Sequence, residues 1–205
     1  MKILLYMWGG LCEDALKNTL SEAGHEVTVL NKKCAHFTRD MKLAGELISL
    51  IQSKKIEAVV SFNYIPIISM VCKTTGMSYY SWIYDSPHNT LYAKTITYDC
   101  NHIGCFDRHM TQKFNGFGIN TIKHLPLGFN KNTFKGVLSD TKYECDVSFV
   151  GNLYTGKYAF YDNTRLPDDI RERAEEIIEK QCFDYENDHI GTFFIDEAGG
   201  FDEEL

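Results

Sequence analysis

The stretch SYYSWIYDSPH, residues 78–88, decides how the rest of the chain is interpreted. Its residues 79–83 are apolar, aromatic or small, so they can be buried on both faces of a sheet. The DSPH sequence that follows contains turn-forming and titratable groups, which predict a polar loop after a buried strand. Ligands of open α/β sheets bind beyond the carboxyl ends of the strands, so Asp85 and His88 are the first candidate catalytic residues.

Short apolar runs alternate with helical patterns on both sides of this stretch. Strands are predicted at residues 2–7, 26–30, 57–62, 79–83, 102–106 and 121–125. The helices expected between them cover residues 13–23, 40–53, 66–75, 90–97 and 107–117. This alternation is typical of right-handed βαβ units. We therefore predict an α/β fold in which residues 1–130 form a Rossmann-like parallel sheet flanked by helices.

The pattern changes after residue 130. Residues 131–145 are polar and are interpreted as a linker, and DVSFV at 146–150 predicts a new strand that leads into a glycine-containing loop. A helix is expected at 167–182 with Pro167 in its first turn. We therefore predict that residues 146–205 begin a second, incomplete α/β unit that ends in an acidic tail.

Charge and composition exclude several classes of protein. The net charge of -7 comes from the tail, because residues 184–205 hold eight acidic and no basic residues while the preceding chain nets about +1. A concentrated basic face is missing, which argues against nucleic-acid binding. The apolar runs are far shorter than the roughly 18 residues of a membrane span, so we expect a soluble, cytoplasmic protein.

Cysteine and histidine usage bears on metals and redox state. The seven cysteines are odd in number and scattered, which argues against a disulfide framework and a zinc site and predicts reduced, mostly buried thiols. The seven histidines show no paired ligand spacing. Neither a metal nor a cofactor is expected.

Two further turns follow predicted strands. Gly9 and Gly10 can bring the backbone close to a ligand, with helix amides favouring an anion, although a plain tight turn explains them equally well. Asn63 and Tyr64 are candidates for hydrogen bonding to or stacking on a sugar, and Tyr64 has ordinary packing as its alternative.

The polar residues after the later strands also have two interpretations. Asp85 is a candidate base or charge stabiliser, or else the cap of the next helix, and His88 is a candidate polar contact or an ordinary surface residue. Asp107 is interpreted mainly as an N-cap, while Arg108 and His109 are candidates to face the site.

The chain resembles the CgeB-like spore-maturation family, whose members look like two-domain glycosyltransferases of the GT-B fold. The resemblance covers most of the chain and rests on SFNYIP at 61–66, YYSWIYDSPH at 79–88, CFDRHM at 105–110, HLPLGFN at 124–130 and DVSFVGNLYTGKY at 146–158. It implies that residues 1–130 form the acceptor-side domain. It also implies that Gly151, Asn152 and Lys157 belong to the start of a domain that holds a nucleotide-sugar donor as substrate.

Relatives of this kind continue through a whole second domain, whereas only its first strand, loop and helix are expected here. We therefore expect the isolated chain, as the acceptor-side portion of a glycosyltransferase, not to turn over substrate. Two alternatives remain open, because one fold serves many functions. They are a non-catalytic Rossmann-type module that binds a ligand or partner, and a structural protein of a spore or cell surface.

Overall fold

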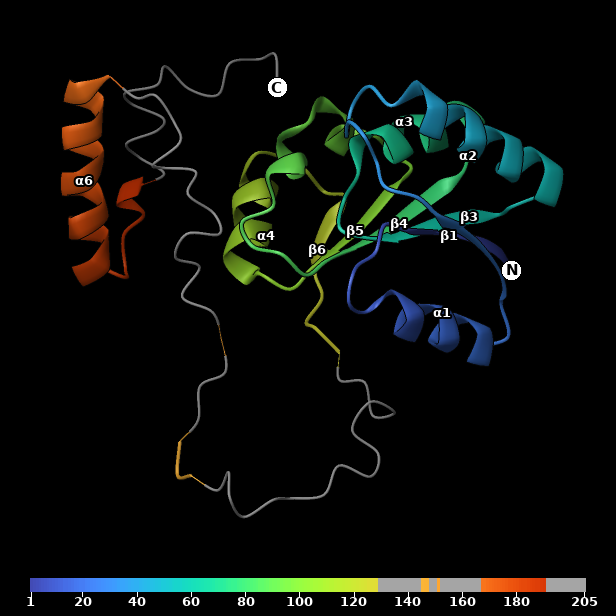
Figure 1. The fold of residues 1–205 in the computed structure, drawn as a ribbon, viewed down its shortest axis with the longest axis horizontal. Coiled ribbons are helices and arrows are strands. Elements are labelled where there is room, and N and C mark those ends of the chain that lie inside the picture. Colours follow the sequence, from blue (N-terminus) through green and yellow to red (C-terminus); the bar gives the residue numbers. More distant parts are fainter. Residues whose placement is uncertain (129–144, 148–150, 152–166, 191–205) are drawn as a thin grey trace. The chain divides into compact units, whose positions relative to one another are not determined.

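The computed structural model describes residues 1–128, 145–147, 151 and 167–190. The chain divides into one unit over Met1–Gly136 and a second over Val137–Leu205. The first unit contains a six-stranded, all-parallel sheet in the order β2-β1-β3-β4-β5-β6 (Figure 1). The strands are β1 (Lys2–Met7), β2 (Glu26–Asn31), β3 (Ala58–Phe62), β4 (Ser78–Ile83), β5 (Asn101–Cys105) and β6 (Ile122–His124). The predicted Rossmann-like α/β class is confirmed.

The strand order explains how helices cover the sheet. The chain moves one way from β1 to β2 and then the opposite way through β3 to β6, and right-handed crossovers place the connections of the two directions on opposite faces. Figure 1 shows α1 below the sheet and α2 and α3 above it. The helices of this unit are α1 (Glu13–Glu22), α2 (Met41–Lys54), α3 (Pro66–Thr75) and α4 (Arg108–Gly116), with short 3-10 turns η1 (Asn89–Tyr92) and η2 (Lys94–Thr97).

Local sequence signals set the helix ends. Asp40 accepts a hydrogen bond from the Leu43 amide and caps α2. Pro66 occupies the first turn of α3, and Gly76 ends that helix in the left-handed region at φ 71°. These ends agree with the sequence-based expectations. The helix expected at 90–97 is instead the pair η1 and η2, because each continues for only four residues.

The main core fills the face of the sheet that packs on α2, α3 and α4. It includes Leu4, Tyr6, Leu43, Leu47, Val59, Ile68, Tyr79, Ile83, Ile103, Phe114 and Ile122. Burying a side chain of this size stabilises the fold by about 1.5–3 kcal/mol. The opposite face is less completely covered, since Tyr80 is 43% exposed and stacks on the exposed His102 ring. Their ring centroids lie 4.6 Å apart.

The expectation that the thiols are mostly buried is wrong. Cys72 and Cys105 are buried, but Cys12, Cys145 and Cys182 are exposed, so the thiols are free yet not mostly buried. Scattered surface positions explain this, since burial depends on the face that a residue occupies and not on its type alone.

The second unit is described over residues 145–147, 151 and 167–190. Its helix α6 (Asp168–Phe183) has Pro167 as the N-cap and not inside the first turn. After the helix, Asp184 accepts hydrogen bonds from Asn187 and contacts the His189 ring, and these interactions lower the pKa of its carboxyl group. The strand predicted at 146–150 lies outside the described residues except for its first two, which form a bend.

Within the described ranges, no helix combines the length and apolarity needed to cross a membrane.

Candidate functional site

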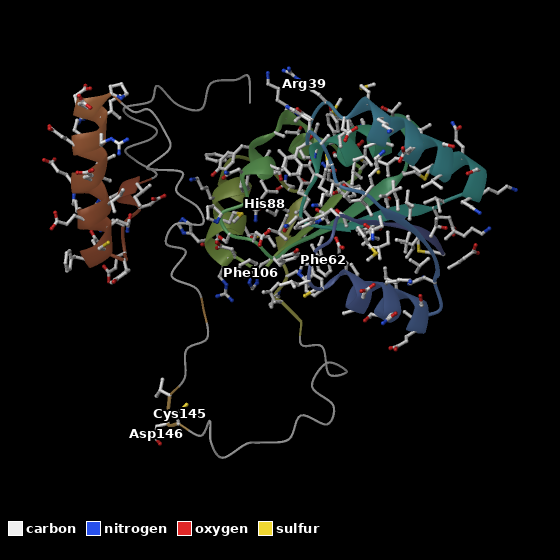
Figure 2. The ribbon with its side chains drawn as sticks, in the orientation of Figure 1. Arg39, Phe62, His88, Phe106, Cys145 and Asp146 are labelled. Carbon is white, nitrogen blue, oxygen red and sulfur yellow. The ribbon has the colours of Figure 1, made fainter. Side chains whose placement is uncertain are left out.

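The candidate site lies where four neighbouring strands end. Strand pairing places the end of β1 beside β3, Phe62 beside Trp82, and Ile83 beside Cys105. The loops after β1, β3, β4 and β5 therefore meet at one edge of the sheet, which we call the carboxyl edge. In Figure 2, the label Phe62 marks the end of β3, and His88 and Phe106 mark the loops after β4 and β5. The β1/β3 boundary, where the strand order reverses, is the usual ligand position of such sheets.

Asn63 and Asp85 meet at this edge. The Asn63 side chain donates from Nδ2 to Asp85 Oδ2 at 2.6 Å, and its Oδ1 accepts the Tyr84 amide at 3.2 Å. Asn63 is buried and adopts a left-handed backbone with φ 56°, which asparagine tolerates better than most residues. Asp85 itself is exposed. The structure thus brings together two predicted site residues and holds a carboxylate in a fixed position facing solvent.

Asp85 does not act as a helix cap, since the N-cap of η1 is His88 and no side chain caps that turn. Of the two interpretations of Asp85, the cap is therefore wrong.

Buried hydroxyl groups fix the turn that carries Asn63. The Tyr79 hydroxyl lies 2.7 Å from Ser61 Oγ and accepts the Ile65 amide at 3.1 Å. The Tyr64 ring packs against the Tyr79 ring, and the Tyr64 hydroxyl donates a hydrogen bond to Thr95 Oγ1 at 2.7 Å. Burial is the main cause of the high pKa of Tyr64, which is about 12, so this phenol stays protonated. Tyr64 therefore packs in the core, which agrees with its alternative interpretation.

His88 is committed to the same turn. Its Nε2 lies 3.2 Å from the Tyr64 amide nitrogen and 2.7 Å from Thr90 Oγ1. Burial lowers the pKa of His88, while the Tyr64 backbone and Asp85 act in the opposite direction. The ring is therefore a neutral tether between the β3 and β4 loops. Its predicted contact with a donor or acceptor stays a prediction.

The expected role of Asp107 as an N-cap is confirmed, and the helix that it caps is α4. Its Oδ1 accepts the Met110 amide at 3.0 Å and begins α4, and its Oδ2 accepts the Ser86 hydroxyl. Burial alone would raise the pKa of Asp107, but these hydrogen bonds and the nearby His109 outweigh it and leave the pKa lowered. Arg108 and His109 are exposed in the first turn of the helix. The Asp107–Ser86 contact joins the β5 loop to the β4 loop.

The glycine turn after β1 contains a carboxylate that the sequence analysis missed. Glu13 is the first residue of α1 and is only 2% exposed. Its Oε1 accepts the Trp8 amide at 2.8 Å, and its Oε2 accepts the Gly9 amide at 3.0 Å. Gly9 has φ 100°, which glycine adopts readily. An acidic residue in the first helical turn, four residues after a glycine, was the available signal.

Tyr84 connects this turn to Asp85 and was also missed. A Cβ atom placed on Gly10 would lie 2.7 Å from the Tyr84 hydroxyl oxygen and 3.4 Å from Glu13 Oε1. Burial, then Asp85 and Glu13, raise the pKa of Tyr84 to about 12. A neutral phenol, carried by the residue that immediately precedes Asp85, therefore lies directly against the glycine turn.

Comparisons with family models, curated proteins and solved structures gave no significant match. The resemblance to CgeB-like proteins stays a prediction.

Three predicted donor-side residues belong to the second unit. Gly151 is exposed, and Asn152 and Lys157 lie outside the described residues. In the part of the chain that the structure describes, no group of three His, Cys, Asp or Glu side chains forms a candidate metal centre.

A hollow of about 370 Å³ lies at the other end of the sheet, near the start of β4. A Lys73–Asp99 ion pair of 2.7 Å borders it. It is lined by Cys72, Lys73, Gly76, Met77, Ser78, Asp99 and Cys100. Ser78 begins β4 and Asp85 lies two residues beyond its end, and the six residues of the strand span about 20 Å at 3.3 Å per residue. This hollow is therefore separate from the carboxyl edge, where the candidate chemistry lies.

Proposed function

We propose that this chain is the acceptor-side portion of a nucleotide-sugar-dependent glycosyltransferase and that it needs a complete donor-side domain for turnover. The observation that carries the proposal is the Asn63–Asp85 pair, in which a buried amide holds an exposed carboxylate at the carboxyl edge. The resemblance of residues 79–88 to CgeB-like proteins supports the assignment of this loop. The strand order supports it as well, because the edge includes the usual ligand position of such sheets.

Asp85 is the proposed general base. It would accept the proton of an acceptor hydroxyl while that oxygen forms a bond to the anomeric carbon and the bond to the diphosphate leaving group breaks. Asn63 orients the carboxylate through its 2.6 Å hydrogen bond. His88 acts as a positioning residue, since its ring holds the Tyr64 backbone on which the Asn63 turn depends.

The test uses a version of the protein that carries a complete donor-side domain. Asp85→Asn should lower kcat by about 10²–10⁴, as expected for loss of a general base. Asp14→Asn, at an exposed position of α1, is the matched control and should leave turnover unchanged. Equal turnover of the Asp85→Asn variant and the unmodified protein would remove Asp85 from the mechanism.

An aromatic surface favours a second function, that of a ligand- or partner-binding module. Tyr80 and His102 stack on the less covered face of the sheet, where Tyr80 is 43% exposed and His102 is exposed. Exposed aromatic groups of this kind often mark interaction sites. The test is a thermal-shift panel of nucleotides and sugars. For a binding module of this type, a ligand should raise the melting temperature of the Asp85→Asn variant as much as that of the unmodified protein, and should not raise that of the Tyr80→Ser variant. Loss of stabilisation only in Asp85→Asn would favour the transferase.

A further inference from the structure

The turn after β1 has the backbone geometry of an anion site, and the group that occupies this site is the Glu13 carboxylate of the same chain. Trp8 and Gly9 direct two successive amides at one point, and convergent backbone amides of this type favour negative charge. Both oxygens of the Glu13 carboxylate lie there, at 2.8 and 3.0 Å from the two nitrogens. The amides belong to the turn itself and precede the first residue of α1.

A free phosphate meets two obstacles at this turn. It would have to displace a 2% exposed carboxylate, which would then be buried without its two donors. It would also approach Asp85, an exposed carboxylate whose charge acts on the Tyr84 hydroxyl beside this turn. Repulsion and the lost hydrogen bonds both oppose binding.

The space over the turn is also occupied. The Tyr84 hydroxyl lies so close to Gly10 that a single added carbon would be 2.7 Å from its oxygen. Because the pKa of Tyr84 is about 12, this hydroxyl remains neutral at physiological pH. A ligand at this turn would therefore meet the neutral Tyr84 hydroxyl and two amides that already donate to Glu13.

We infer that Glu13 is a specificity-determining residue that closes the β1 turn to phosphate groups, so that the ligand presents an uncharged, hydroxyl-bearing part to this turn. In identifying that ligand as an acceptor sugar, the inference rests on the proposed function. The exclusion of phosphate does not depend on turnover and is measured by binding alone. Failure of transfer in the extended protein would therefore leave the exclusion intact.

The experiment follows the Trp8 and Gly9 amide resonances of the full 205-residue chain by ¹⁵N NMR during titration with sodium pyrophosphate. Sodium chloride at matched ionic strength is the reference. The unmodified protein should show no specific shift of these two resonances. Glu13→Ala should show a saturable shift of both resonances at pyrophosphate concentrations that leave them unshifted in the unmodified protein, since the amide pair is then without its carboxylate. Asp14→Ala removes the same charge from the next residue and should behave like the unmodified protein.

Specific shifts of the Trp8 and Gly9 amides in the unmodified protein would overturn the inference, because the turn would then be open to phosphate. A folded Glu13→Ala variant whose Trp8 and Gly9 resonances do not shift with pyrophosphate would also overturn the inference, since the amide pair would not be an anion site. If Glu13→Ala fails to fold, Glu13→Gln replaces it, and the titration of the unmodified protein still decides whether phosphate is excluded.

Discussion

Glu13 and Asp85 are two carboxylates at the same edge of the sheet with opposite surroundings. Glu13 is buried and accepts two backbone amides, whereas Asp85 is exposed and accepts one side-chain amide from Asn63. Glu13 follows a glycine turn and occupies its amides, whereas Asp85 follows a buried strand and faces solvent. An acidic residue near a strand end is therefore a candidate for chemistry only if the fold leaves its oxygens accessible.

The largest effect expected from this comparison is on the stability of Glu13 variants. Glu13→Ala should lower the free energy of unfolding by about 2–4 kcal/mol, because the Trp8 and Gly9 amides both lose a charged acceptor whose side chain is buried. Urea denaturation measures the change. Asp14→Ala is the control and should stay within about 0.5 kcal/mol. Equal effects of the two substitutions would mean that Glu13 acts only through its charge and not through the turn.

The packing of the glycine turn is tested by Gly10→Ala. The added methyl group would contact the Tyr84 hydroxyl at 2.7 Å, so the variant should lose about 1–3 kcal/mol by overpacking. Adding Tyr84→Phe removes the hydroxyl and should recover most of this loss in a double-mutant cycle.

Gly45→Ala in α2 is the control for the Gly10 variant, since a Cβ atom at Gly45 would have no atom within 4 Å apart from its chain neighbours and the backbone of its own helix. It should stabilise the protein by about 0.5–1 kcal/mol because alanine favours helix. Additive effects of Gly10→Ala and Tyr84→Phe would show that the two groups do not touch.

The neutral tether formed by His88 predicts a pH dependence. Because burial holds the pKa of His88 below its unfolded value of about 6.5, the unfolded state takes up a proton first as the pH falls. The stability contributed by neutral His88 should be complete above about pH 6.5 and should decline below it. Denaturation curves at several pH values should give a shallower decline for His88→Gln than for the unmodified protein.

His124, an exposed histidine at the end of β6, provides the control for this pH effect. The His124→Gln variant should keep the decline of the unmodified protein. A decline that is unchanged in His88→Gln would contradict a buried, neutral ring at this position.

The smallest effect is expected at Asp85. Asp85→Asn keeps the shape of the side chain and an acceptor for Asn63, so the free energy of unfolding should change by less than about 0.5 kcal/mol. Chemical denaturation of the 205-residue chain measures it. A loss above about 1 kcal/mol would make Asp85 a structural residue like Glu13 and would weaken its proposed role as a base.

Much of the fold follows from short-range pattern. Alternating apolar runs predicted all six strands of the first unit to within one or two residues, because strands buried in a parallel sheet need apolar side chains on both faces. Pro66, Gly76 and Asp107 were predicted at helix ends because their backbone or hydrogen-bonding preferences are local. Local preference was not sufficient at Asp85. Its interpretation as a helix cap is wrong, because the next helical turn is the short η1, whose N-cap is His88.

The α/β class, the order of the elements and the loops at which candidate residues occur all follow from the amino-acid sequence. The contacts that those residues make depend on which strands and turns become neighbours in the folded chain. Glu13 meets the Trp8 and Gly9 amides because the turn folds back on α1, and Asn63 meets Asp85 because β3 and β4 are neighbours. The physical reason is that a hydrogen bond depends on distance in space, and 22 residues of chain separate Asn63 from Asp85.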